Sequence, residues 1–417
     1  MGQRRVDGTS GTNAGALGRR AVLAIVAAGC LAACSDEGTD DDTERLQARI
    51  DDCARSGGGD VRLNGGSFRV RELRIPSGVS LVGASGTRLV GLADQAILSV
   101  SRGAHDVVIS GLSLVVPGAA DHGIVVSDAS RRVTVRNVSI EGGGSGIGVD
   151  VRKGSSSIQV VECVIKGVGT GVRVLDGAVS VQVRNLDVQD WLQRGIAFRS
   201  TSGSGASTKI HVSGNVIGAP RPGSGVRQPI QFSASSGGYF RSVTVVSNRI
   251  DGPSEDDKGS KQAGTADQIS LHGCRDFSVR RNSVLGGGEV GITVSRGSRD
   301  GRVVGNTCEG NDSAGIVIGS MTGERVHDVV VEGNVCRGNG RNHGGKLPRT
   351  ARSGIAVRNA QGVKVRQNSL DAGDGRFQIY GVSVAASAQV VIGENRFAGA
   401  KDANVLRFQK PSKSENL

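Results

Sequence analysis

The chain has 417 residues, enough for two or three compact domains, but 66 of them are glycine and only 8 are proline. Aromatic residues make up 3% of the sequence, which leaves a core of β-branched side chains and few platforms for stacking nucleic-acid bases. The formal net charge of +12 favours acidic partners, and we expect no nucleic acid among them. These features predict one elongated repeat domain rather than several globular ones.

The first 33 residues have the organisation of an export signal. A basic stretch ending in Arg19-Arg20 precedes the apolar run from Ala21 to Gly29, and Leu31-Ala32-Ala33-Cys34 follows. This order resembles the lipobox of bacterial lipoprotein signals, which implies removal of residues 1–33 and lipidation of Cys34. An ordinary secretory signal cut nearby is the alternative. No other segment reaches ~18 uninterrupted apolar residues, so we expect an exported chain that is anchored to a bacterial membrane through its lipid.

A capping helix is predicted at residues 43–56, after a linker at 34–42. Leu46, Ile50, Cys53 and Ala54 have helical spacing, and Asp42 stands at the N-cap position. The open end of a solenoid exposes core and strand edges, so such a helix would cover the first turn. Three glycines follow, and strands are predicted at residues 60–63 and 67–73.

Two short patterns alternate from about Val79 onward, an apolar-x-apolar strand ending in Asn and the sequence Gly-Ile-x-Val. The Asn positions are 137, 185, 215, 248, 282, 306, 334, 368 and 395, spaced 24 to 48 residues apart, and Glu162 halves the widest gap. A period of 23 to 34 residues with several short strands fits one turn of a β-solenoid. We therefore expect a solenoid over residues 43–400 and a tail at 401–417, with Ile and Val pointing inward. The Asn positions are expected to be structural, as left-handed turn residues or as a ladder of side-chain amides.

The entry into the repeats has a further likeness. Residues 60–68 (DVRLNGGSF) and 76–83 (PSGVSLVG) resemble the start of the pectate-lyase-like β-helix superfamily, and the repeats extend the likeness to about residue 398. The resemblance implies an all-β fold, a right-handed parallel β-helix with an N-terminal capping helix. The superfamily includes lyases, glycoside hydrolases, epimerases and non-catalytic surface proteins, so the fold leaves the activity open.

Acidic residues recur just before the inward isoleucines. If Ile269, Ile292, Ile316 and Ile355 stack, Asp267, Glu289, Asp312 and Arg352 fall on one flank. Neighbouring turns are ~4.8 Å apart, so carboxylates one or two turns apart cover both separations used by glycosidases, about 5–5.5 Å and 6.5–9.5 Å. Asp267 and Glu289 are the first candidate catalytic pair, with Asp267 as base and Glu289 as acid. Solvated turn residues are the alternative.

The same segment resembles the polygalacturonase type of glycoside hydrolase. Asp267-Gln268-Ile269 falls where that family has an Asp-Gly-Ile sequence, and residues 314–320 resemble its Gly-His-Gly strand. Val290 stands in place of one of the family's paired acids, and Ala314 stands at its His position. The complete machinery of that family is therefore not expected.

A lyase or an epimerase would need a cation for the uronate carboxylate and a base for the adjacent proton. The base candidate is His272. The substrate-binding candidates are Asp312, Arg296, Arg299, Arg352, Arg358 and Lys261. Two long insertions, at residues 251–266 and 338–353, enter the same flank and could line a groove for an anionic chain, with Lys258, Lys261, His343, Lys346 and Arg349. Mobile surface loops and ordinary surface charge are the alternatives.

Cofactors are not indicated by any motif. The acidic run at residues 255–257 lacks the spacing of a Ca²⁺ loop, so Ca²⁺ is without specific support. Cys53, Cys163, Cys274, Cys308 and Cys336 lack metal-site spacing and are predicted to be core residues. The last two occupy the same place in consecutive repeats, either as stacked thiols or as a disulfide.

The sequence thus predicts a monomeric, exported protein that cleaves an acidic polysaccharide, with lyase and hydrolase activity both open. A uronan epimerase and a non-catalytic surface solenoid that binds polysaccharide are the alternatives.

Overall fold

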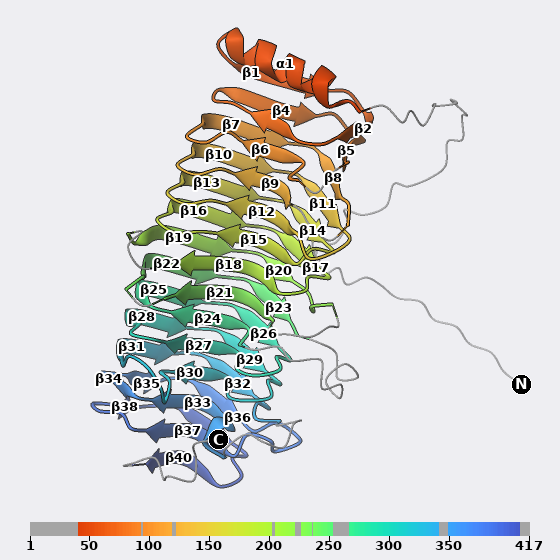
Figure 1. Ribbon diagram of the computed structural model, residues 1–417. Helices are drawn as coiled ribbons and strands as arrows, with labels where there is room; N and C mark the ends of the chain where they lie inside the picture. The colour runs from red at the N-terminus through yellow and green to blue at the C-terminus, as the bar shows by residue number, and fades with distance from the viewer. Residues whose placement is uncertain are drawn as a thin grey trace, which may run out of the picture. The chain divides into compact units, whose positions relative to one another are not determined.

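The structure is a computed structural model that describes residues 41–92, 95–118, 122–201, 205–221, 227–235, 237–252, 267–341 and 349–408. The proposed lipidation residue Cys34 and the predicted groove residues Lys258, Lys261, His343 and Lys346 lie outside these ranges. From residue 41 onward the described strands form three parallel sheets, and each turn of the chain contributes one strand to each sheet (Figure 1). We name them sheets A, B and C.

The bounds of the strands are as follows. Sheet A contains β1 (Gly59–Leu63), β4 (Val79–Gly83), β7 (His105–Ser110), β10 (Arg131–Arg136), β13 (Ser156–Val161), β16 (Val179–Arg184), β19 (Ser207–Ser213), β22 (Phe240–Val246), β25 (Cys274–Arg280), β28 (Arg299–Val304), β31 (Val326–Glu332), β35 (Lys364–Arg366) and β38 (Val391–Ile392), with β34 (Ala360–Gln361) beside β31. Sheet B contains β2 (Gly66–Val70), β5 (Thr87–Gly91), β8 (Ser113–Val116), β11 (Ser139–Gly142), β14 (Val164–Lys166), β17 (Asp187–Gln189), β20 (Val216–Ile217), β23 (Arg249–Asp251), β26 (Ser283–Leu285), β29 (Thr307–Glu309), β32 (Val335–Arg337), β36 (Ser369–Asp371) and β39 (Arg396–Ala398). Sheet C contains β3 (Leu73–Ile75), β6 (Leu98–Val100), β9 (His122–Val126), β12 (Ile147–Val151), β15 (Thr170–Val174), β18 (Arg194–Ser200), β21 (Gln228–Ala234), β24 (Ile269–His272), β27 (Ile292–Ser295), β30 (Ile316–Ile318), β33 (Ser353–Arg358), β37 (Tyr380–Ala385) and β40 (Ala403–Phe408).

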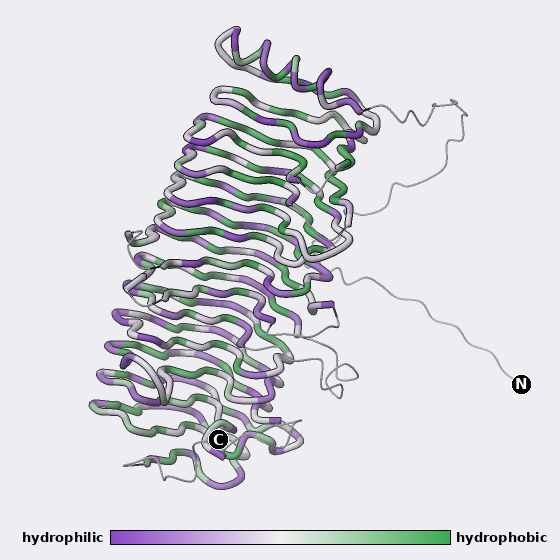
Figure 2. The backbone as a smooth tube through the Cα atoms, viewed as in Figure 1, coloured by the Kyte–Doolittle hydropathy of each residue, from purple (hydrophilic) through white to green (hydrophobic). Residues whose placement is uncertain are grey.

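Like residues stack over like residues between turns. Ile269 pairs with Ile292, Ile292 with Ile316, and Ile316 with Ile355, as the Gly-Ile-x-Val pattern predicts. These side chains are fully buried in one continuous core of mainly Val, Ile and Leu. Figure 2 shows the corresponding alternation of hydrophobic and hydrophilic residues along the strands. Stacking therefore supplies the burial that a single turn lacks.

The predicted Asn positions fall into two structural classes. Asn137, Glu162 and Asn185 adopt left-handed backbone conformations, with φ of 51°, 55° and 55°. The Asn residues from Asn215 onward stand one position further along the turn and are stacked. The side-chain N–H of each donates a hydrogen bond to the side-chain oxygen of the next Asn at 2.8–2.9 Å. This ladder runs through Asn215, Asn248, Asn282, Asn306, Asn334, Asn368 and Asn395. Both predicted roles thus occur, but in different turns.

A short second ladder was not predicted. It lies at the corner between sheets B and C, where the Asn311 amide donates to Asn339 at 2.8 Å. The backbone N–H of Gly287 donates to Asn311 at 3.0 Å.

The two ends of the solenoid differ in detail from the prediction. Helix α1 (Thr43–Arg55) packs Leu46 and Ile50 onto the first turn, one residue shorter than expected. Asp42 makes no side-chain cap, because its carboxylate accepts the N–H of Arg69 at 3.0 Å. The Asp41 carboxylate instead accepts the N–H of Thr43 at 3.0 Å.

Two boundaries need correction. The strand predicted at residues 67–73 is two strands, since β2 ends at Val70 and the chain turns into sheet C before β3 begins at Leu73. The last turn also continues past residue 400, where a tail was expected, because β40 pairs along β37 with Val405 beside Val382.

The described cysteines behave as predicted core residues with one partial exception. Cys308 and Cys336 are paired neighbours in β29 and β32, both fully buried and both free thiols. Cys53 lies on α1 and is only partly buried. In the described part of the chain, no helix is both long and apolar enough to cross a bilayer.

Candidate functional site

Several of the predicted site residues lie on or beside the outer face of sheet C. Between the inward residues of each strand lies one solvent-side position, and we call this series the central outer column. Its members are Arg74, Ser99, Val125, Asp150, Arg173, Ala197, Gln231, Ser270, Thr293, Val317, Ala356, Ser383 and Leu406.

Asp267 immediately precedes β24, at the corner where the chain enters sheet C. It lies beside the turn that carries Glu289, because the N–H of Gln268 donates to the carbonyl oxygen of Val290 at 2.9 Å. The pKa of Asp267 is raised to about 7, mainly by burial and further by the charge of Glu289. Thr293 and the Val290 backbone offset part of the rise. The two predicted carboxyl groups thus interact.

Glu289 lies in the turn between β26 and β27. Desolvation by the surrounding protein raises its pKa too, although the residue as a whole is exposed. The more strongly raised group is Asp267, so Asp267 keeps a proton near neutral pH more readily than Glu289 does. This order favours Asp267 as the acid, whereas the sequence analysis assigned it the role of base, because the deeper carboxyl group loses more hydration on ionisation.

His272 is the last residue of β24 and points outward on the same sheet. Burial, together with the charge of Arg296, lowers the pKa of His272 to about 4. The imidazole is therefore neutral at pH 7 and only weakly basic. Arg296 follows β27 in a left-handed conformation, at the corner between sheets C and A.

The remaining predicted binding residues separate into several places. Asp312 lies on the turn next to Glu289, and its N–H donates to the carbonyl oxygen of Gly287 at 2.9 Å. Arg358 ends β33, on the outer face of sheet C. Arg299 does not belong to this face. It is the first residue of β28 in sheet A, because the chain has already turned the corner after Arg296, and its Nε lies 3.8 Å from Asp300.

Arg352 and Arg349 stabilise the corner rather than facing a groove. The Arg352 guanidinium donates to the carbonyl oxygens of Gly340 at 2.8 Å and Phe377 at 3.1 Å. Arg349 forms an ion pair with Asp402.

A small apolar cluster lies next to the carboxyl pair. Val290, Ala314, Val317 and Ala356 are buried together, separate from the main core. Two of them, Val290 and Ala314, are the residues at which the sequence departs from the polygalacturonase pattern that it resembles, and both are packed as apolar side chains. Ser270, at the neighbouring central position, is fully buried, and its hydroxyl has no hydrogen-bond partner among the described residues.

A charged cluster on the first turns was missed by the sequence analysis. The Asp150 side chain in β12 is fully buried, and both of its oxygens accept hydrogen bonds from Arg173 at 2.8 Å. The Nε of Arg152 lies 2.5 Å from Asp150, and His122 Nε2 lies 3.4 Å from it. Burial acts against ionisation, but His122, Arg173 and Arg152 outweigh it and lower the pKa of Asp150 to about 2. Aligning Val149-Asp150-Val151 with Val172-Arg173-Val174 would have paired Asp150 with Arg173.

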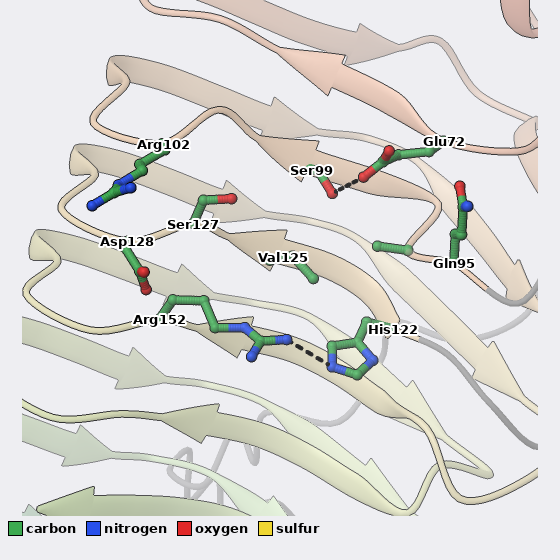
Figure 3. Close-up of a pocket in the computed structure, with 10 residues that line it drawn as sticks. Glu72, Gln95, Ser99, Arg102, His122, Val125, Ser127, Asp128 and Arg152 are labelled. Carbon is green, nitrogen blue, oxygen red and sulfur yellow. Dashed lines mark hydrogen bonds between the residues drawn. The ribbon is translucent and has the colours of Figure 1, made fainter.

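Above this cluster the face is hollowed. A depression of about 540 Å³ spans the turns of β3, β6, β9 and β12 (Figure 3). Its lining residues are Glu72, Gln95, Ala96, Ser99, Arg102, His122, Val125, Ser127, Asp128 and Arg152. We call this depression the N-terminal pocket.

The fold and these sites can be set beside known proteins. Residues 153–397 match the family described as right handed beta helix region, and the chain belongs to that family. No curated protein sequence matches the chain.

Solved structures show the same fold at low identity. The chain is similar to the A-module of the mannuronan C-5 epimerase AlgE6 of Azotobacter vinelandii, with 16% identity and a TM-score of 0.52 over 90% of this chain and 97% of that one. It is similar to tailspike protein 3 of bacteriophage CBA120, with 14% identity and a TM-score of 0.61 over 91% and 58%. It is also similar to the surface adhesin PfbA of Streptococcus pneumoniae, with 14% identity and a TM-score of 0.58 over 90% and 98%. At these identities the likeness shows the fold alone.

Proposed function

We propose that this protein is an exported glycoside hydrolase that cleaves an acidic polysaccharide with Asp267 and Glu289. The observation that carries the proposal is the interacting carboxyl pair beside sheet C, in which the pKa of Asp267 is raised to about 7. Two carboxyl groups on adjacent turns, one protonated and one ionised, are the minimum that acid-catalysed glycosidic cleavage requires.

The chemistry follows from the two protonation states. Asp267 donates its proton to the glycosidic oxygen as the bond to the anomeric carbon breaks. Glu289 accepts a proton from a water molecule, whose hydroxyl adds to that carbon. Strand spacing of ~4.8 Å is compatible with either stereochemical outcome, because side-chain rotamers decide the separation of the carboxyl oxygens.

An acidic substrate is supported by the charge of this face and of the whole chain. Arg296 and Arg358 lie on the sheet A side of the carboxyl pair, and Arg173 lies on the central outer column. The net charge of +12 has the same sign. Known β-helix proteins of this fold include an enzyme named for mannuronan and a tailspike solved with a pentasaccharide, which agrees with a saccharide ligand.

Elimination or epimerisation has weaker support, because His272 is a poor base at a pKa of about 4. A non-catalytic binding protein is favoured by one observation, the buried apolar cluster around Val290 and Ala314 next to the carboxyl pair. Binding without turnover would then be the whole function.

Cleavage is tested with the purified mature chain on polygalacturonate, alginate and hyaluronan at pH 5.5. We expect new reducing ends without growth of the unsaturated-uronate absorbance. Asp267→Asn and Glu289→Gln should each lower the rate by about 10²–10⁴-fold. Asp300→Asn and Glu394→Gln, which change exposed acids elsewhere, are the matched controls and should retain the wild-type rate.

Three results would contradict the proposal. Growth of absorbance would indicate elimination, retained binding without any product would indicate a binding protein, and full activity of both site variants would remove the site.

Export and lipid anchoring belong to the same proposal and rest on the N-terminal sequence. Changing Cys34 to Ser should move the protein from the membrane fraction to the soluble fraction of a bacterial host. Membrane retention of this variant would argue against the anchor.

A further inference from the structure

The N-terminal pocket is built from a different set of side chains than the carboxyl pair. Apart from Ala96 and Val125 its lining side chains are polar, and none of them is Phe, Tyr or Trp. Its volume of about 540 Å³ lies within the ~300–1,000 Å³ range of ligand pockets. A lining with only two small apolar side chains disfavours large hydrophobic molecules.

The floor of the pocket is fixed by the buried Asp150. This single carboxylate receives two guanidinium groups, Arg173 through two hydrogen bonds and Arg152 through Nε at 2.5 Å. Arg152 remains 37% exposed and lines the pocket, and its Nη2 lies 3.3 Å from His122 Nε2. Its orientation is therefore set before any ligand arrives, which lowers the entropic cost of binding.

The pocket can attract an anion because part of its negative charge is already neutralised. Its lining contains two guanidinium groups, from Arg102 and Arg152, and two carboxylates, from Glu72 and Asp128. The Glu72 carboxylate lies 3.2 Å from Nη2 of Arg74. The buried Asp150 carboxylate beneath the pocket is neutralised by Arg152 and Arg173. Arg102 is exposed on the rim and forms no ion pair with a described residue.

The carboxylates on the rim select among anions. Glu72 and Asp128 can accept hydrogen bonds from hydroxyl groups but repel a simple phosphate or sulfate ion. Ser99, Ser127 and Gln95 add further neutral partners (Figure 3). A ligand with one carboxylate and several hydroxyl groups fits both requirements.

We propose that the N-terminal pocket is a second saccharide site that binds a uronate unit, with Arg102 and Arg152 holding its carboxylate and Glu72 and Asp128 its hydroxyl groups. Five strand spacings along the central outer column separate Val125 from Ser270, which is ~24 Å. The site is thus distinct from the carboxyl pair, and it goes beyond the proposed function because it requires no cleavage.

The test is calorimetric titration of the mature chain with tetragalacturonate and tetramannuronate. The double variant Arg102→Gln, Arg152→Gln should bind one ligand fewer per chain than wild type. Arg102→Gln alone should weaken this site about tenfold, and it leaves the buried Asp150 contacts intact. The matched control is Arg88→Gln, Arg136→Gln, which removes two exposed arginines from sheets B and A and should bind as wild type does.

Competition and a second variant make the test decisive. Maltotetraose and inorganic phosphate should each fail to displace the uronate at equal concentration. Unchanged stoichiometry and affinity in both arginine variants would overturn the proposal. Equal binding of maltotetraose would also overturn it, since the pocket would then recognise hydroxyl groups alone. Equal binding of phosphate would overturn it as well, since the pocket would then recognise charge alone. The Asp267→Asn, Glu289→Gln chain should keep the pocket ligand while losing cleavage, so failure of one proposal is separable from failure of the other.

Discussion

Asp150 lies on the outer face of sheet C and Asp267 at the corner where the chain enters that sheet, and their environments shift their pKa values in opposite directions. Both are desolvated, which opposes ionisation in each case. At Asp150 two arginines and His122 overcome that cost, and its pKa falls to about 2. At Asp267 the neighbouring charge is the carboxylate of Glu289, and its pKa rises to about 7. Burial by itself raises the pKa of an acid; the cationic partners of Asp150 reverse that effect, whereas the anionic partner of Asp267 adds to it.

The contrast separates an acid that stays ionised from one that titrates near neutral pH. Asp150 stays ionised at every pH at which the protein is expected to work, so it can hold Arg152 and Arg173 but cannot exchange a proton. Asp267 changes its protonation state near neutral pH, as a catalytic acid must.

Removing Asp150 should have the largest effect on stability. Asp150→Ala leaves two guanidinium groups without their carboxylate, and we expect the free energy of unfolding to fall by about 3–5 kcal/mol. Asp267→Asn, measured at pH 4, where Asp267 is protonated in the folded protein and only partly ionised in the unfolded chain, should change it by less than about 1 kcal/mol. Urea denaturation of the two variants checks this difference, and equal losses would break the comparison.

The pH dependence of stability should also differ in sign between the two acids. Asp150 has a folded pKa below its ordinary 3.8, so its contribution is present above pH 4 and is lost as the pH falls toward 2. Asp267 has a folded pKa above 3.8, so its protonated form stabilises the fold below pH 4 and this contribution is lost as the pH rises to about 7. Between pH 4 and 7 the wild type should lose roughly 1.4 kcal/mol per pH unit relative to Asp267→Asn. Parallel stability curves for these two proteins would contradict the raised pKa.

Hydrolysis should follow the same titration. Because Asp267 must be protonated, kcat/KM should fall about tenfold per pH unit above pH 7. Because Glu289 must be ionised, the rate should also fall on the acid side, with its midpoint above the ordinary value for glutamate. A rate that rises through pH 8 would indicate a base-catalysed reaction instead.

The smallest expected effect concerns the polar groups of the central outer column. Asp150 has its hydrogen bonds satisfied, whereas the buried hydroxyl of Ser270 has no partner among the described residues. Ser270→Ala should therefore leave the free energy of unfolding unchanged or raise it by up to about 1 kcal/mol. A loss of more than ~1 kcal/mol would show that the hydroxyl is hydrogen-bonded in solution.

The fold was predictable because its signal is repeated in every turn. The inward residues at Ile269, Ile292 and Ile316 lie in the predicted register, and Glu162 occupies the place of a missing Asn. The local exceptions were not predictable from periodicity. The side chain of Asp42 turns to Arg69, and β40 adds a strand beyond residue 400, because contacts with the neighbouring turn decide both.

The site was predictable only in part. Sequence spacing placed Asp267 and Glu289 on neighbouring turns, but relative burial, which sets which of them keeps the proton, has no signature in the spacing. The Asp150 cluster was missed because its arginine is 23 residues away and becomes a neighbour only through the strand register.

The most direct test of the account is a carboxyl-carbon NMR titration of the protein labelled with ¹³Cγ-aspartate. The resonance that disappears in Asp267→Asn should titrate with a midpoint near pH 7, whereas the resonance that disappears in Asp150→Ala should remain ionised down to pH 3. A midpoint near pH 4 for Asp267 would contradict the account, because the carboxyl pair would then hold no proton at the pH where cleavage is proposed.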